Sequence, residues 1–146
     1  MILAFAACYD WDIKTFNFIG AYLNGELNNN KDIYMYVLPS YEHEDEQVKH
    51  LKKSLYSLKQ AGHQWYNTLS SVLAEIGFRV SKADLGIFYL CTQYDILILA
   101  MHIDDCVLTG SSSELIIDYK KTINAKYLLT NLGLVHWLLS IKIIRD

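Results

Sequence analysis

Two adjacent carboxylates, Asp104 and Asp105, follow the apolar run Ile96–Ala100 in this chain of 146 residues. In a strand, successive side chains point to opposite faces, but at a hairpin turn the backbone can bend so that both acids reach one side. Two carboxylates a few ångströms apart repel each other, and a divalent cation or a bound proton relieves that repulsion. The pair therefore indicates a candidate magnesium site. On this pair alone, an exposed polar turn remains the alternative.

Lysines gather in one other part of the sequence that could do chemistry. The net charge of −3 gives the chain no broad attraction for a phosphate backbone, so any contact with nucleic acid must be local. The local source is Lys49–Lys53, followed by Lys59 and preceded by the acidic run Glu42–Glu46. A charged, solvated hairpin explains the same pattern.

The bulk composition indicates one soluble globular domain. Hydrophobic residues make up 52% of the chain, and its apolar runs are shorter than the roughly 20 residues that a membrane-spanning helix needs. The apolar start Met1–Cys8 lacks the basic region of a secretory signal. Cys8, Cys91 and Cys106 show no Cys-x-x-Cys spacing, which predicts reduced intracellular thiols and not a disulfide or zinc framework.

Several elements must position these residues. The apolar segment Met1–Tyr9 favours a helix, and Ile13–Phe18 favours a strand. A polar turn at Asn28–Asp32 then separates this region from the expected strands Ile33–Val37 and Val48–Leu51.

The second half of the chain has clearer periodicity. Apolar residues three and four positions apart predict a helix over Ala61–Ile76, ended by Gly77. The segments Ile87–Leu90 and Tyr94–Ile103 predict an antiparallel hairpin, which Val107–Thr109 extends past the two acids. Ser111–Ser113 supplies the start of a further helix, Asn131–Gly133 is expected to break it, and His136–Ile144 returns to an extended pattern. This order of elements is that of an α+β protein.

Six segments, in this order along the chain, resemble the blocks of copia-type reverse transcriptases: GAYLNGEL, IYMYVLPSYE, VKHLKKSLYSLKQAGHQWY, GFRVSKADLGIFYL, ILILAMHIDDCVLTGS and LTNLGLVHWLLSIKIIRD. The resemblance implies a polymerase fingers–palm core, with an antiparallel sheet and helices packed on one face. It also implies that residues 1–146 are part of that domain. The first part of the fingers and the thumb, ribonuclease H and integrase regions are expected outside this range.

The resemblance also implies roles for particular residues. Asp104 and Asp105 take the place of the metal-binding pair in a two-metal magnesium site, and Lys59 and Gln60 become candidate contacts for the incoming nucleotide or the template. Lys52 and Lys53 add the nearby positive charge. The third metal-binding aspartate of the family falls at position 17, which is Asn17 here. An asparagine keeps an oxygen ligand but loses the charge.

Four further positions bear on the activity of this copy. Asp12 could substitute for the missing acid only with a five-residue insertion; otherwise it lies about 16 Å along an extended strand, on the opposite face. His102 stands at an aromatic position, Ser57 replaces a glycine of the family, and Asn131 replaces an aspartate. If that glycine has positive φ, Ser57 costs roughly 1 kcal/mol or more.

Two functions follow from the resemblance. The first is a polymerase that binds an RNA or DNA template-primer and adds deoxynucleotides to the primer 3′-hydroxyl by in-line phosphoryl transfer. The second is a non-catalytic transposon remnant that binds nucleic acid weakly through Lys49–Lys53 and Lys59. In both cases the implied location is intracellular, in the cytoplasm or a virus-like particle, with no membrane partner. An α+β domain unrelated to polymerases is the third alternative.

Overall fold

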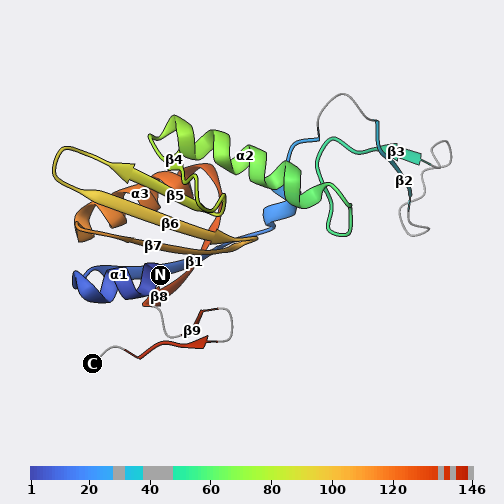
Figure 1. Cartoon of the computed structure of the whole chain (residues 1–146). Coiled ribbons are helices and arrows are strands. Elements are labelled where there is room, and N and C mark those ends of the chain that lie inside the picture. The colour runs from blue at the N-terminus through green and yellow to red at the C-terminus, as the bar shows by residue number, and fades with distance from the viewer. Residues whose placement is uncertain (28–31, 38–47, 135–136, 139–140, 145–146) are drawn as a thin grey trace. The chain divides into compact units, whose positions relative to one another are not determined.

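The computed structural model describes residues 1–27, 32–37, 48–134, 137–138 and 141–144 (Figure 1). The acidic run Glu42–Glu46 lies outside these residues. The expected turn Asn28–Asp32 also lies outside them, except for Asp32. Two compact units form within the chain: the first joins Met1–Ile19 to Val72–Asp146, and the second is Gly20–Ser71.

The first unit is built on one antiparallel sheet of six strands, in the order β4-β5-β6-β7-β1-β8. Two further short strands, β9 and β10, pair with each other. Its elements are α1 (Ile2–Cys8), β1 (Asp12–Phe18), β4 (Arg79–Val80), β5 (Ile87–Cys91), β6 (Ile96–His102), β7 (Asp105–Gly110), α3 (Ser113–Lys126), β8 (Leu129–Leu134), β9 (Trp137–Leu138) and β10 (Ile141–Lys142).

The sheet has one fully packed face. Because side chains alternate along a strand, Phe16 and Phe18 of β1 point to the same face as Leu108 of β7 and Leu97 and Leu99 of β6, and all five are buried. Helix α3 packs on this face, since its Lys120 ammonium lies 5.5 Å from the centroid of the Phe16 ring. This face holds the main core of the unit.

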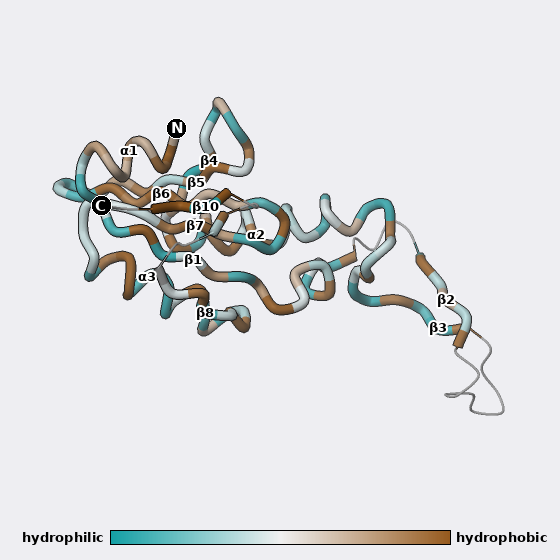
Figure 2. Tube along the Cα trace, turned by 90° about the horizontal axis from the view of Figure 1, so that it is seen from below, coloured by the Kyte–Doolittle hydropathy of each residue, from teal (hydrophilic) through white to brown (hydrophobic). Residues whose placement is uncertain are grey.

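The opposite face carries a smaller cluster at one end. Ile13 of β1 and Val107 of β7 pack there against Ala6 of α1, with Trp11 beside them. Figure 2 shows α1 and α3 on opposite sides of the strands. The expectation that the helices pack on one face is therefore wrong for α1. An apolar seven-residue helix directly before β1 can reach only the face to which its short connection leads, and Ala6 buries against Ile13 there.

Helix α3 begins as the sequence predicts but ends differently. The Ser112 side chain accepts a hydrogen bond from the Leu115 amide and caps the helix. The helix ends at Lys126, before the expected breaker, and Asn131–Gly133 lies inside strand β8. A register shift between Thr15 and Phe16 of β1, together with a φ of 75° at Gly133, accommodates this glycine in the strand. The prediction that Asn131–Gly133 breaks the helix is wrong.

The second unit contains η1 (Ala21–Asn24), β2 (Tyr34–Tyr36), β3 (Val48–His50) and most of α2 (Ala61–Glu75), which continues into the first unit. Trp65 of α2 is buried, and a Cβ built on Gly25 would lie 3.0 Å from the Trp65 backbone nitrogen. Gly25 thus allows the chain to approach α2 closely. Among the described residues, no helix is long and apolar enough to cross a membrane.

Candidate active site

Four polar side chains form a row across adjacent strands of the first unit. In the register of the sheet, Asp105 of β7 pairs with His102 of β6 on one side and with Asn17 of β1 on the other, and Asn17 pairs in turn with Thr130 of β8. Directly opposed residues of antiparallel strands share a face, with Cα atoms about 4.5–5.5 Å apart. Folding therefore brings Asn17 and Asp105 together from distant parts of the sequence.

This row lies on the less covered face of the sheet, away from the α1 cluster. Odd-numbered residues of β1 and β7, such as Ile13, Thr15 and Val107, point to the face that carries the α1 cluster, and Asn17 and Asp105 share this face. Even-numbered residues of the two strands point to the packed face. Asp104, Asp105 and Asn17 are half-buried, and His102 is exposed. These groups therefore lie outside the main core, on the opposite face of the sheet.

A strained turn presents Asp104. The loop between β6 and β7 has two residues, Ile103 and Asp104, because His102 and Asp105 still pair. Ile103 has a φ of 60°, which is an outlier for a β-branched residue. The Phe18 amide donates a hydrogen bond of 3.0 Å to the Asp104 carbonyl oxygen and fastens the turn to β1. Strain of this kind persists only where the surrounding structure holds it, and it gathers at functional sites.

Among the described residues, the Asn17 side chain is an acceptor with no partner. Its Oδ1 is buried and accepts no hydrogen bond from any of them, and a buried polar atom left in this state costs about 1–3 kcal/mol. Mg²⁺ accepts carboxylate and amide oxygens as ligands, so in chemical type Asp104, Asp105 and Asn17 Oδ1 fit the donor set of one such ion. Within the described residues, no cluster of three or more His, Cys, Asp or Glu side chains is arranged to hold a metal.

The surroundings of Asp105 include a small cavity and a buried thiol. The cavity, of about 40 Å³, is lined by Asp105, Thr15, Trp137 and other residues of the same unit, and it is large enough for a water molecule or an ion. Burial raises the pKa of the Cys106 thiol, and the charges of Asp105 and then Asp104 raise it further. Cys106 is therefore a protonated packing residue and cannot serve as a metal ligand in this state.

Asp12 takes no part in this group. Its carboxylate accepts a hydrogen bond of 2.6 Å from the Ser113 hydroxyl at the start of α3, and its register partner is Gly110. Asp12 and Asn17 are at opposite ends of β1 and, being an odd number of residues apart, on opposite faces. The alignment that puts Asp12 in the place of Asn17 treats Phe16–Gly20 as an insertion, whereas β1 pairs with β7 without a break from Asp12 to Asn17.

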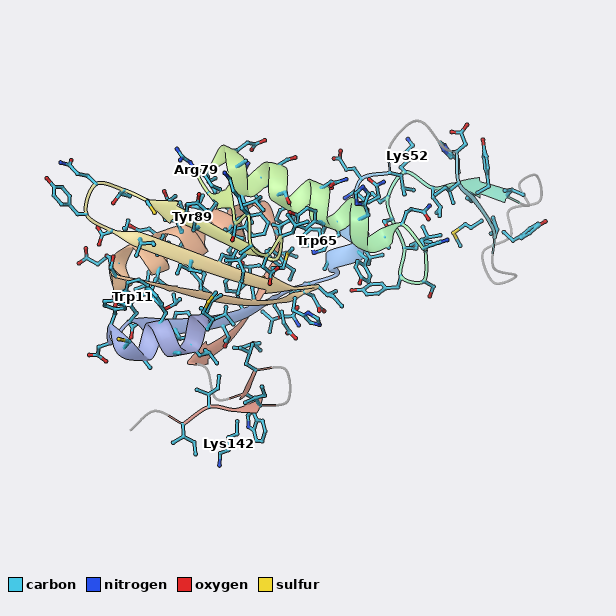
Figure 3. All side chains as sticks on the ribbon, in the orientation of Figure 1. Trp11, Lys52, Trp65, Arg79, Tyr89 and Lys142 are labelled. Carbon is cyan, nitrogen blue, oxygen red and sulfur yellow. The ribbon has the colours of Figure 1, made fainter. Side chains whose placement is uncertain are left out.

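The predicted nucleotide and template contacts lie in the second unit. Lys52 (Figure 3), Lys53 and Lys59 are exposed and Gln60 is half-buried. The Gln60 carbonyl accepts the Gln64 amide in the first turn of α2, and the Lys52 carbonyl accepts the Leu27 amide at 3.4 Å. These lysines have no carboxylate partner in the described part of the chain.

A family model described as reverse transcriptase (RNA-dependent DNA polymerase) matches residues 1–146. The chain belongs to the reverse transcriptase family. Three relatives agree, all named Retrovirus-related Pol polyprotein. The protein from transposon RE1 of Arabidopsis thaliana is 29% identical over 97% of the chain, and that from transposon RE2 of the same plant is 31% identical over 86%. The protein from transposon TNT 1-94 of Nicotiana tabacum is 28% identical over 99%.

The chain spans 10%, 8% and 11% of the length of these three relatives, so it corresponds to a fragment of each. No solved structure matches the chain. The resemblance to copia-type reverse transcriptases is confirmed, as is the α+β class with an antiparallel sheet. The roles of individual residues in this reverse transcriptase stay predictions.

Thr130 is the member of the polar row that sequence reasoning missed. It lies beside Asn17 because β8 pairs with β1. The segment Leu129–Leu134 contains Asn131 and Gly133, which in a single sequence indicate a turn and not a strand. Only the pairing of β8 with β1 reveals the Thr130 hydroxyl as a neighbour of the site.

Proposed function

We propose that this chain is the palm-type part of a reverse transcriptase that adds deoxynucleotides to a primer 3′-hydroxyl, with impaired activity in this copy. The observation that carries the proposal is the pairing of Asn17 with Asp105 on the open face of the sheet, beside the strained turn that holds Asp104. Asn17 and Asp105 are register partners and Asp104 precedes Asp105 in the turn, which supports a metal centre formed by these three residues.

The proposed roles follow from these positions. Asp104 and Asp105 would hold magnesium at the tip of the β6–β7 hairpin, with Asn17 Oδ1, a buried acceptor, as a neutral third ligand. Magnesium bound there would supply charge stabilisation for phosphoryl transfer. The rigid pairing of β1 with β7 fixes the ligand oxygens before substrate binds, which removes a cost of reorganisation from the reaction.

The impairment follows from the missing charge at position 17. With an amide at this position, the group would hold magnesium with one negative charge fewer than the three-acid set of the family, and it would stabilise the charge of the transition state less. If the loss amounts to about 4 kcal/mol of transition-state stabilisation, the rate falls on the order of a thousandfold. We therefore expect the unmodified chain to be a very slow polymerase.

Lys59 and Gln60 are the proposed contacts for the incoming nucleotide or the template, with Lys52 and Lys53 nearby in the same unit. The three lysines are exposed and without a carboxylate partner among the described residues, which leaves their charge available for phosphate. RNA or DNA template-primer and deoxynucleotides are the proposed partners. Cys8, Cys91 and Cys106 are free thiols, which supports the proposed intracellular location.

A second function, a non-catalytic remnant that binds nucleic acid weakly, is favoured for the isolated chain by the neutral Asn17 amide. In this case the lysines of the second unit bind the phosphate backbone without turnover. Binding of this kind weakens steeply with salt, because it depends on the release of counterions from the nucleic acid.

Magnesium-dependent primer extension by the whole chain tests both functions. We compare the unmodified chain, Asn17→Asp, and Asn17→Asp combined with Asp105→Asn as the matched loss of one carboxylate. Extension only after Asn17→Asp, and its loss in the double variant, supports an impaired metal centre. Robust extension by the unmodified chain contradicts the impairment. No extension by any variant, with salt-sensitive binding of template-primer retained, favours the remnant.

A further inference from the structure

A groove on the packed face of the sheet, away from the candidate active site, gathers three lysines. It lies between α3 and the strands β1 and β8, with a volume of about 600 Å³, and its lining includes Lys14, Lys120 and Lys121. The side chains of Lys14 and Asp105 point to opposite faces of the sheet, since their positions differ in parity across the β1–β7 register. The groove is therefore separate from the carboxylate row.

The positive charge of the groove is only partly compensated. Lys121 lies 3.8 Å from the Asp118 carboxylate, one turn away on α3. Lys14 and Lys120 are half-buried and have no carboxylate partner in the described part of the chain. Burial lowers the pKa of Lys120, and the neighbouring charge of Lys14 lowers it further. Two ammonium groups that line one groove and repel each other favour a bound anion.

The side-chain oxygens of the two asparagines of the groove already accept hydrogen bonds within the chain. Asn131 Oδ1 already accepts hydrogen bonds from the Lys120 ammonium at 2.6 Å and from the Gly133 amide at 3.1 Å. Asn124 Oδ1 likewise accepts from the Leu129 amide at 3.1 Å. Their Nδ2 groups remain as donors, so the polar side chains of the lining offer ammonium and amide N–H groups and few acceptors. A ligand that satisfies them must itself be rich in acceptors.

The remaining wall is apolar and comes from Ile116, Ile117 and Leu129. A groove of several hundred Å³ with an apolar wall and a few convergent polar groups is typical of a small-ligand site. Lysine ammonium groups and amide donors suit phosphate oxygens. An apolar wall beside them suits a flat, weakly polar ring such as a nucleobase.

We propose that the groove bounded by Lys14, Lys120 and Asn131 binds the phosphate group of a nucleotide, with the base against the apolar wall. The nucleotide is either free in solution or a unit of a nucleic-acid strand. This binding needs no magnesium and no catalysis, so it stands apart from the polymerase function. The proposed binding of phosphate depends on the neutral side chain of Asn131, because a carboxylate at this position would neutralise the charge of Lys120 from within the chain.

The test is a titration of the isotope-labelled chain, without magnesium, with inorganic phosphate, adenosine monophosphate and a short single-stranded oligonucleotide in separate arms. The amide signals of Gly133 and of the Asn131 side chain report the groove, and in Asn131→Asp the Gly133 amide reports it alone. The variants are Lys14→Gln and Asn131→Asp, and the matched control is Lys82→Gln. Lys82 is exposed and follows β4, at the opposite edge of the sheet from β8, so its change removes the same charge elsewhere.

We expect adenosine monophosphate to shift these signals, with affinity about tenfold lower in Lys14→Gln and Asn131→Asp, the loss of roughly one charge-assisted hydrogen bond, and unchanged in Lys82→Gln. Asn131→Asp keeps both hydrogen bonds that Oδ1 accepts, so it also serves if Lys14→Gln fails to fold. If the oligonucleotide competes with the monophosphate, the ligand of the groove is a nucleic-acid strand. If only the monophosphate binds, the ligand is a free nucleotide. Equal weakening by Lys82→Gln, no binding in any arm, or preference for a glutamate-rich peptide over every phosphate overturns the proposal.

Discussion

The substitution Asn17→Asp should make the stability of the first unit depend on magnesium. Asp105 lies directly opposite position 17 in the sheet, so the Cα atoms of the two acidic residues would lie about 5 Å apart, and we take their charges at a similar separation. At an effective dielectric constant near 20, two such charges repel by about 3 kcal/mol. Without metal, we expect the free energy of unfolding to fall by roughly 1–3 kcal/mol, the lower figure applying where one acid takes up a proton.

Magnesium should reverse this loss, because the third carboxylate becomes a ligand. An ion at a concentration a hundredfold above its dissociation constant stabilises the folded state by about 2.7 kcal/mol, which is close to the repulsion removed. Urea unfolding, followed by tryptophan fluorescence with chelator and with excess magnesium, measures both terms. In the unmodified chain the difference between the two conditions should be much smaller.

The control for this experiment is Gln93→Glu, which also converts an amide to an acid within the first unit. Gln93 is exposed, in the loop between β5 and β6, at the other end of β6 from the turn that holds Asp104. Its variant should respond to magnesium like the unmodified chain. If Asn17→Asp is equally unstable with chelator and with magnesium, or loses no stability with chelator, positions 17 and 105 do not form a metal centre and the reasoning is refuted.

Three other substitutions test the local geometry. Ser57, with a φ of 77°, is the third residue of a turn closed by the Leu58 amide on the Leu55 carbonyl, so Ser57→Gly should raise the free energy of unfolding by roughly 0.5–1 kcal/mol; a lower urea midpoint would contradict this. Asp12→Asn should lower the free energy of unfolding by about 1 kcal/mol, because it weakens the hydrogen bond from Ser113. It should leave the magnesium response of Asn17→Asp intact, and loss of that response would indicate that Asp12 is a ligand. Gly110→Ala should cost about 1–3 kcal/mol, because its Cβ would lie 2.4 Å from the Ile96 carbonyl oxygen; thermal unfolding at the temperature of the parent chain would argue against this close approach.

Local patterns in the sequence predict the elements of the second half well. The helix expected over Ala61–Ile76 is α2 at Ala61–Glu75, and the hairpin expected on both sides of Cys91–Gln93 is β5 with β6. Both predictions succeed because burial of one helix stripe, or of a β-branched strand, is enough to select the local structure. The serine-rich start of α3 is found for the same reason, since Ser112 is a local cap.

Pairings between distant segments are harder to predict. Strand β8 exists because β1 offers it hydrogen bonds, and its Asn131 and Gly133 indicate a turn when taken alone. The same holds for the candidate site: spacing supplies Asp104 and Asp105, and resemblance supplies Asn17. Asn17 and Asp105 are neighbours because of the register between β1 and β7, and no periodic pattern in the sequence predicts this register. The lysine groove is also invisible in the sequence, because Lys14 and Lys120 meet only after α3 packs on the sheet.

Two tryptophans with apolar neighbours in the sequence differ in burial. Trp65 is buried in the second unit, whereas Trp137 is 63% exposed on β9. Trp137 also lines the small cavity at Asp105. An apolar neighbourhood in sequence thus predicts packing for a long helix better than for a two-residue strand, which has little partner surface.

The central place of β1 in the sheet has a consequence for biosynthesis. Its partner β7 is distant: Thr109 and Asp12, joined by a hydrogen bond, are 97 residues apart in the sequence. At a translation rate of roughly 5–20 residues per second, β1 waits about 5–20 s for this partner. During that interval the strand bearing Phe16 and Phe18 has two unpaired edges, which favours aggregation. A nascent chain arrested before β7 should therefore depend on chaperones, and one arrested after β8 should not.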